Sequence, residues 1–164
     1  MGAQDAWLLA AIPAGMFVVL ALSGRWLPRG GDLLGVAATG AAFVLFFPLL
    51  ADFLDTQGAL GDGLGPILKS IEWSEIGTGA GVEGAFILRQ GTYVDPITIV
   101  MFGVVTSVSL MVNIFSIGYM KGEPRYYWFF AVLQLFAASM LLLVMADNLL
   151  LLYISWELVG VCSF

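Results

Sequence analysis

Long apolar runs constrain this chain more than any other feature. They cover residues 6–22, 33–50, 96–117 and 126–146, and each is about as long as the roughly 17–25 residues that a helix needs to cross a bilayer. The hydrocarbon core offers no hydrogen-bond partner to an exposed backbone, so helices are the simplest structures that span it. The runs therefore predict four complete transmembrane helices.

A fifth apolar run begins at Leu149 and is still apolar at Phe164, the last residue of the sequence. At about 1.5 Å per residue it would reach roughly 24 Å, short of a hydrocarbon core of ~30 Å. We expect a truncated fifth helix, or one that another polypeptide completes. The predicted fold class is an all-α polytopic membrane protein with four full transmembrane helices and an incomplete fifth.

Composition excludes several kinds of chemistry. Hydrophobic residues make up 60% of the chain and charged residues 11%, whereas soluble domains have about 25% charged residues. A net charge of −6 argues against nucleic acid as a partner. The sequence has no histidine and a single cysteine, Cys162, which excludes histidine-ligated haem or metal, Ser-His catalysis and an intrachain disulfide.

The chain divides into three parts at a segment rich in glycine and acids. Residues 1–54 hold the first two predicted helices and a basic turn, residues 55–95 form an extramembrane loop, and residues 96–164 hold the third to fifth helices. Loose alternation of apolar residues predicts a candidate hairpin around residues 77–79. The acids of the loop match no EF-hand spacing, which favours solvated loop charge over a cation site.

The basic residues predict an orientation. Arg25, Arg29, Lys121 and Arg125, four of the six, lie in the turns after the first and third runs. An up-and-down path of the chain places these two turns on the same side of the membrane. By the positive-inside rule they face the cytoplasm or its organellar equivalent, and the N-terminus is extracytoplasmic.

Polar side chains form a stripe on the third predicted helix. Thr106, Ser109, Asn113 and Ser116 recur at helical spacing, and Gln134 is the strongly polar residue inside the fourth run. In a membrane helix such groups face protein or water. Packing between helices is the favoured interpretation, and a polar lining for water, formed by Thr106, Ser109, Asn113 and Gln134, is the alternative.

Glu157 is the ionisable residue well inside a predicted span. It lies roughly 13 Å from Asn148 along the helix, and a charge at such depth costs at least a few kcal/mol. Low-polarity surroundings favour the neutral carboxyl and a cationic neighbour favours the charged form. A group balanced between the two can relay a proton, which makes Glu157 the candidate catalytic residue. A structural glutamate is the alternative, and a charge partner must come from outside this sequence.

The segment around Glu157 also carries a family resemblance. Residues 146–164, ADNLLLLYISWELVGVCSF, resemble the signature ADNLL…WE-x-VG-x-CS of the antiporter-like chain L (mitochondrial chain 5) family of NADH-quinone oxidoreductase, respiratory complex I. Residues 94–96 (VDP), 116–120 (SIGYM) and 129–131 (FFA) agree in order and spacing. The resemblance is good from Asp95 to Phe164 and holds only in pattern before that. It implies an N-terminal fragment of such a subunit.

The resemblance implies a proton-translocating membrane-arm subunit built as an inverted-repeat helix bundle. In that family the glutamate at the position of Glu157 pairs with a lysine two helices later and takes part in proton translocation. The chain would hold no cofactor itself; NADH, FMN, iron–sulfur clusters and quinone would bind partner subunits. The expected partners are the lipid bilayer and other membrane-arm subunits, in a bacterial inner (plasma) membrane or an organellar inner membrane.

Other functions share the signature. Multisubunit sodium/proton antiporters, inorganic-carbon uptake complexes and membrane-bound hydrogenases contain chains of similar pattern. A non-transporting membrane scaffold, in which Glu157 is only structural, is the alternative from a different class.

Overall fold

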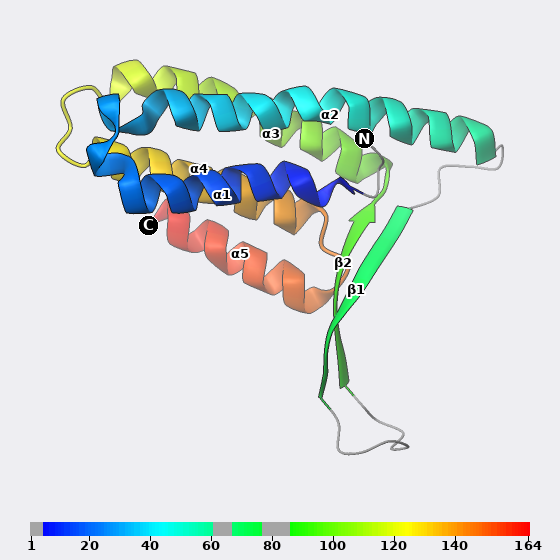
Figure 1. Cartoon of the computed structure of the whole chain (residues 1–164). Coiled ribbons are helices and arrows are strands. Elements are labelled where there is room, and N and C mark those ends of the chain that lie inside the picture. The colour runs from blue at the N-terminus through cyan, green and yellow to red at the C-terminus, as the bar shows by residue number, and fades with distance from the viewer. Residues whose placement is uncertain (1–4, 61–66, 77–85) are drawn as a thin grey trace.

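The computed structural model describes residues 5–60, 67–76 and 86–164, and long helices lying side by side dominate it (Figure 1). Among the described residues, four helices have the length and apolar composition to cross a membrane and a fifth apolar helix is shorter, which confirms the predicted class. The elements in chain order are α1 (Trp7–Ser23), the short 3-10 turns η2 (Gly24–Trp26) and η3 (Pro28–Gly31), α2 (Asp32–Leu60), β1 (Ile67–Ile76), β2 (Phe86–Val94), α3 (Pro96–Tyr119), α4 (Tyr126–Val144) and α5 (Leu149–Ser163).

Side-chain caps fix where α3 and α5 begin. Asp95 precedes Pro96, and its Oδ1 accepts a hydrogen bond of 2.7 Å from the amide of Thr98. Asn148 caps α5 in the same way, with Oδ1 accepting from the amide of Leu151 at 2.8 Å. Each cap satisfies a backbone donor that the first turn of a helix leaves free. The starts of both helices are therefore set locally by the sequence.

Helix α2 continues beyond its predicted apolar run. We expected the span to end near Leu50, yet α2 reaches Leu60 and contains Pro48. Asp52 and Asp55 end the apolar run, but residues of this kind are compatible with helical backbone. Hydropathy marks where a helix leaves the hydrocarbon core, whereas the backbone stays helical until a stop signal is reached.

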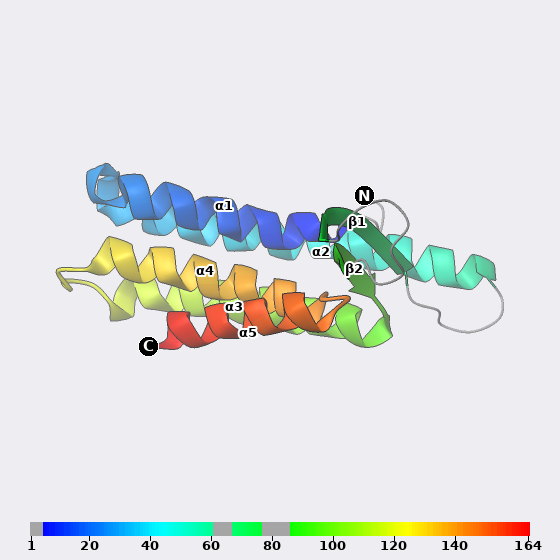
Figure 2. The same ribbon diagram turned by 90° about the horizontal axis from the view of Figure 1, so that it is seen from below.

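Helix α4 lies at the centre of the bundle. It packs against α1, α5 and α3 and also contacts α2 (Figure 2). Two apolar clusters hold it. One lies toward the basic turns and is built on Leu20, Phe130 and Ala131. The other lies toward the opposite end and includes Phe46, Phe102, Leu141 and Met145, together with Ala6, Leu9, Ala10, Leu49, Phe53, Val94, Ile99 and Val105.

The loop with the candidate hairpin contains two antiparallel strands that extend away from the bundle (Figure 1). β1 and β2 pair from Ile67 opposite Val94 to Ile76 opposite Phe86. The expected turn at residues 77–79 lies outside the described residues. At the base, the Tyr93 amide donates to the Met145 carbonyl at 2.9 Å, which attaches β2 to the turn before α5.

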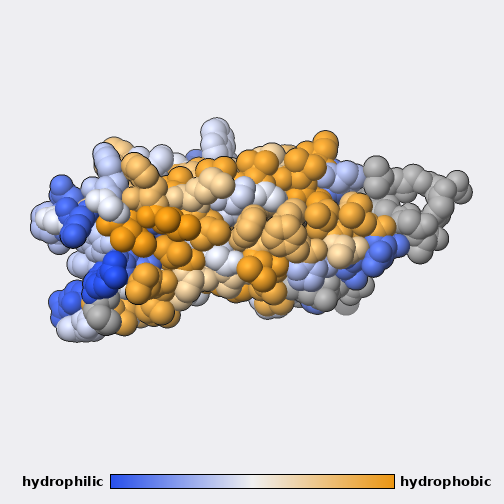
Figure 3. All heavy atoms as spheres, turned by 90° about the horizontal axis from the view of Figure 1, so that it is seen from above, coloured by the Kyte–Doolittle hydropathy of each residue, from blue (hydrophilic) through white to orange (hydrophobic). Residues whose placement is uncertain are grey.

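An apolar belt surrounds the middle of the bundle. The face in Figure 3 is predominantly hydrophobic between hydrophilic ends. Large apolar side chains on several helices are exposed, among them Val18, Val44, Phe115 and Ile114. So much exposed apolar surface is not tolerated in water. It suits contact with lipid or with further membrane helices.

Gly35 allows α2 to approach α3 and α4 closely. A Cβ atom at this position would lie 3.1 Å from Nε2 of Gln134 and 3.5 Å from Oδ1 of Asn113. Small residues at such points let membrane helices pack closely. The absence of a side chain is therefore a packing requirement.

The substitution Gly35→Leu should destabilise the bundle by about 1–3 kcal/mol, because it overpacks the contact between three helices. The measurement is denaturant unfolding in detergent, followed by tryptophan fluorescence. Gly15→Leu is the matched control, since nothing lies within 4 Å of a Cβ atom at Gly15. Equal stability of the two variants would show that the contact at Gly35 is loose.

Candidate functional site

A layer of polar groups separates the two apolar clusters at the centre of the bundle. It consists of Gly35, Thr39, Ser109, Asn113 and Gln134, contributed by α2, α3 and α4, and we call it the polar layer. Asn113 and Gln134 are fully buried, and Thr39 is 2% exposed. The predicted polar residues of α3 and α4 thus lie inside the protein.

Gln134 connects three helices. Its Nε2 atom donates to the Gly35 carbonyl on α2 at 3.1 Å and to Oδ1 of Asn113 on α3 at 3.0 Å. Asn113 in turn donates from Nδ2 to the Ser109 carbonyl at 2.9 Å. In a low-polarity interior these bonds replace the water that the amides would otherwise need. The polar layer therefore fixes how α2, α3 and α4 meet.

The other polar residues of the α3 stripe, Thr106 and Ser116, are buried in the bundle and lie outside the polar layer. The Thr106 hydroxyl donates to the Phe102 carbonyl at 2.6 Å, and Thr106 and Ser116 are buried. Oε1 of Gln134 is buried without a hydrogen-bond partner among the described residues. Buried polar atoms of this kind are commonly satisfied by internal water. The observed contacts are packing contacts, and a water-lining role remains a hypothesis.

Glu157 lies on a different part of the molecule, the outer face of α5. This helix packs on α4 through the side that carries Ser155, which is fully buried. Because successive residues are about 100° apart around a helix, Glu157 points away from α4, and it is exposed. Among the described residues it makes no ion pair. The structure therefore keeps Glu157 and the polar layer apart.

The surroundings of Glu157 are almost entirely apolar. We call the large exposed residues of α5 the open face: Leu149, Leu150, Leu152, Tyr153, Ile154, Trp156, Glu157 and Val161. Tyr153 lies one turn before Glu157 on the same helix, and both side chains are exposed. The open face thus carries one carboxylate and one phenol among apolar side chains.

Two buried polar residues were not singled out by the sequence analysis. Asp32 is 1% exposed at the start of α2, although the sequence placed it in a basic turn. The position of Asp32 directly before the apolar run of residues 33–50 was the sequence signal that could have indicated its burial. Ser155 is buried with its hydroxyl unpaired among the described residues, and α5 alone gives no hint of which side faces α4. No group of three or more His, Cys, Asp or Glu side chains suited to a metal ion occurs in the described part.

Comparison with known proteins shows the family to which the chain belongs. Residues 83–130 match the profile described as NADH-Ubiquinone oxidoreductase (complex I), chain 5 N-terminus. Subunit L of NADH-quinone oxidoreductase from Mycobacterium tuberculosis is 38% identical over 164 residues, which is the whole of this chain and 24% of that protein. The chain belongs to the chain 5 family. Its Escherichia coli relative, also NADH-quinone oxidoreductase subunit L, is 35% identical over 96% of this chain and 24% of that protein.

This chain 5 family member also resembles a subunit of a different dehydrogenase and a solved structure of the Mrp complex. Subunit L of the F(420)H(2) dehydrogenase from Methanosarcina mazei is 35% identical over 98% of this chain and 21% of that protein. A structure of the Mrp complex from Dietzia sp. has the same fold, with a TM-score of 0.69 and 24% identity over 97% of this chain and 15% of that one. The chain thus spans about a quarter of the length of its curated relatives.

The bond between Gln134 and Asn113 should be visible as a coupling energy. In a double-mutant cycle with Gln134→Leu and Asn113→Leu, each single change leaves a buried polar group unpaired, whereas the double change removes both. We expect a coupling of about 0.5–1.5 kcal/mol, measured by unfolding in detergent. Effects that add within about 0.3 kcal/mol would contradict the bond.

Proposed function

We propose that this chain forms the N-terminal part of a proton-translocating membrane subunit of a complex I-type NADH-quinone oxidoreductase, in which Glu157 exchanges a proton. The observation that carries the proposal is the position of Glu157 on the open face of α5. This carboxylate points away from every helix of the described chain, on a surface that is otherwise apolar apart from Tyr153.

A carboxylate on the open face needs a polar environment. Glu157 lies about 13 Å from the cap of α5, well within the apolar helix. Facing lipid there, an ionised group costs at least a few kcal/mol. The open face is therefore covered by polypeptide or by water in the working protein, or else Glu157 binds a proton.

The described helices offer no cation to Glu157. Arg25, Arg29, Lys121 and Arg125 all lie in the turns at the end of the bundle. We place the cationic partner in a helix beyond the described residues. The relatives are about four times as long as this chain and have room for such a helix in the same subunit.

Approach and withdrawal of such a cation would drive proton exchange at Glu157. A nearby positive charge stabilises the carboxylate and releases its proton, and loss of that charge in apolar surroundings favours uptake. We assign Tyr153, one turn before Glu157 on α5, the role of donating a hydrogen bond that holds the ionised carboxylate in place. The chemistry at Glu157 is thus a proton transfer governed by a second charge.

The attachment of α5 offers a way to couple this switch to motion elsewhere. The Asn148 cap starts the helix, and β2 holds the preceding turn through the Tyr93–Met145 bond. The polar layer fixes α4, on which α5 packs. We assign Thr106, Ser109, Asn113 and Gln134 this supporting role and retain a water-lining role as its alternative.

Redox chemistry would occur in other subunits. The names of the relatives specify different electron donors, NADH in one case and F(420)H(2) in another, while the sequences match this chain at 38% and 35% identity. A membrane subunit that handles protons and not electrons explains why the donor varies. NADH, FMN, iron–sulfur clusters and quinone are accordingly assigned to partners.

The proposed orientation places the basic turns in the cytoplasm or its organellar equivalent. The α1–α2 and α3–α4 turns, which hold Arg25, Arg29, Lys121 and Arg125, lie at the same end of the bundle (Figure 1). The hairpin lies at the other end, with the first helix beginning there. The positive-inside rule then gives an extracytoplasmic N-terminus.

The experiment is proton pumping in vesicles that carry the whole assembled enzyme, driven by its electron donor, with Glu157→Gln. Glutamine keeps the shape and removes the ionisation. We expect normal assembly and a fall in pumped protons per electron of at least severalfold. Glu123→Gln, a carboxylate in the exposed α3–α4 turn, should pump like the parent.

Two results would count against the proposal. Unchanged pumping by an assembled Glu157→Gln enzyme would make Glu157 structural. Transport that requires sodium and proceeds without electron transfer would instead support the antiporter alternative.

A further inference from the structure

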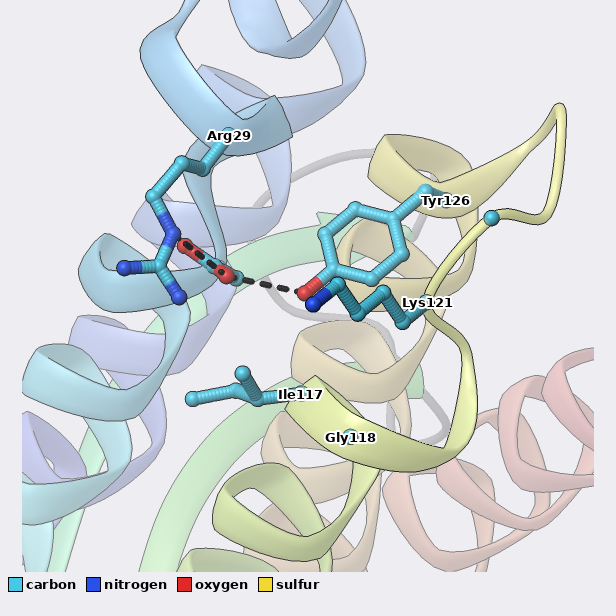
Figure 4. Close-up of a pocket in the computed structure, with 7 residues that line it drawn as sticks. Arg29, Ile117, Gly118, Lys121 and Tyr126 are labelled. Atoms are coloured by element: carbon cyan, nitrogen blue, oxygen red, sulfur yellow. Dashed lines mark hydrogen bonds and ion pairs between the residues drawn. The ribbon is translucent and has the colours of Figure 1, made fainter.

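A hollow of about 410 Å³ lies between the two basic turns of the bundle. It is lined by Arg29, Asp32, Ile117, Gly118, Lys121, Gly122 and Tyr126, and Figure 4 shows it in close-up. Its volume is in the range of sites for small organic groups, about 300–1,000 Å³. The ends of α3 and α4 meet here, so it lies where the apolar belt gives way to the polar end of the protein. This is the headgroup level of a bilayer, whichever way the protein is oriented.

The one acid of the hollow is already engaged. Oδ2 of Asp32 accepts a hydrogen bond from the Tyr126 hydroxyl at 2.8 Å and lies 3.4 Å from Nε of Arg29. Oδ1 accepts from the amide of Leu33 at 2.7 Å. The Asp32 side chain is 2% exposed, so its charge is offset by Arg29 and presents little surface to a ligand.

Arg29 is held with its guanidinium on the wall of the hollow. Its backbone has φ +57°, a conformation that residues with a side chain seldom adopt. The contact with Asp32 uses only Nε, so both terminal amino groups stay available. The side chain is 60% exposed. A planar guanidinium with free N–H groups binds phosphate oxygens well.

Lys121 faces the same hollow from the other wall (Figure 4). It is exposed and makes no ion pair with the residues that the structure describes. With Arg29 offset by Asp32, the lining carries a net charge of about +1. A group with a single negative charge and several acceptor oxygens complements this arrangement.

Apolar surface continues from the hollow toward the middle of the bundle. Ile117 and Gly118 of α3 form part of the lining, and Ile114, one turn away on the same helix, is 53% exposed. A free anion would make no use of this surface. A phospholipid would, because its acyl chains run from the headgroup level into the apolar belt.

We propose that this hollow binds the headgroup of an anionic phospholipid, with the phosphodiester between Arg29 and Lys121 and the acyl chains along α3. Basic pockets between membrane helices are a known means of recognising anionic lipids. Asp32 and Tyr126 position the guanidinium and do not touch the lipid. The site is separate from Glu157 and does not depend on the proposed proton transfer.

The test titrates the assembled enzyme, purified and delipidated in detergent, with phosphatidylglycerol and with phosphatidylcholine of the same acyl chains, following the lipid bound to the parent and to each variant by native mass spectrometry. We expect a preference for phosphatidylglycerol, which Lys121→Gln weakens about fivefold. Arg29→Gln should weaken it as well, but it also leaves Asp32 without its cation. Lys121→Gln is therefore the deciding variant.

Arg25→Gln is the matched control. It removes one positive charge from the same end of the protein, where Arg25 lies 4.3 Å from the Trp26 ring and outside the hollow. Binding should stay at the parental level. Parental affinity in Lys121→Gln, or equal loss in Arg25→Gln, would overturn the proposal. Displacement of the lipid by inorganic phosphate at similar concentration would assign the hollow to a free anion instead.

Discussion

The hydrogen bonds of Gln134 reflect the constraint that shapes the whole structure: lipid offers polar groups no hydrogen-bond partners. A polar side chain in an apolar helix must find its partner in the protein, and Gln134 finds two on different helices, the Gly35 carbonyl and Asn113. A Cβ atom at Gly35 would lie 3.1 Å from Nε2 of Gln134, so the missing side chain leaves room for this contact. The arrangement of α2, α3 and α4 follows, and α1 and α5 pack on α4.

The sequence predicts the parts of this structure that depend on local chemistry. Apolar runs give the four spans, and the Asp95–Pro96 pair gives the start of α3. The partner of Gln134 could not be predicted, because helical spacing shows which residues share a face and not which helix that face meets. The buried state of Asp32 was missed for the same reason, since Tyr126 and Asp32 are 94 positions apart.

Glu157 departs from the rule that the polar layer obeys. Its carboxylate lies within an apolar helix, yet the described chain covers neither it nor Tyr153. The sequence identified the residue because a charge at such depth is costly, but the direction in which it points had to come from the fold. The bundle thus contains a buried amide that joins helices and, on α5, an acid that the described chain leaves exposed.

The central claim, that Glu157 exchanges a proton during turnover, is tested most directly by infrared difference spectroscopy of the assembled enzyme. We expect a carbonyl-stretch band of a protonated carboxyl that changes during turnover, disappears in Glu157→Gln and persists in Glu123→Gln. A turnover spectrum that is the same in the parent and in Glu157→Gln would contradict it.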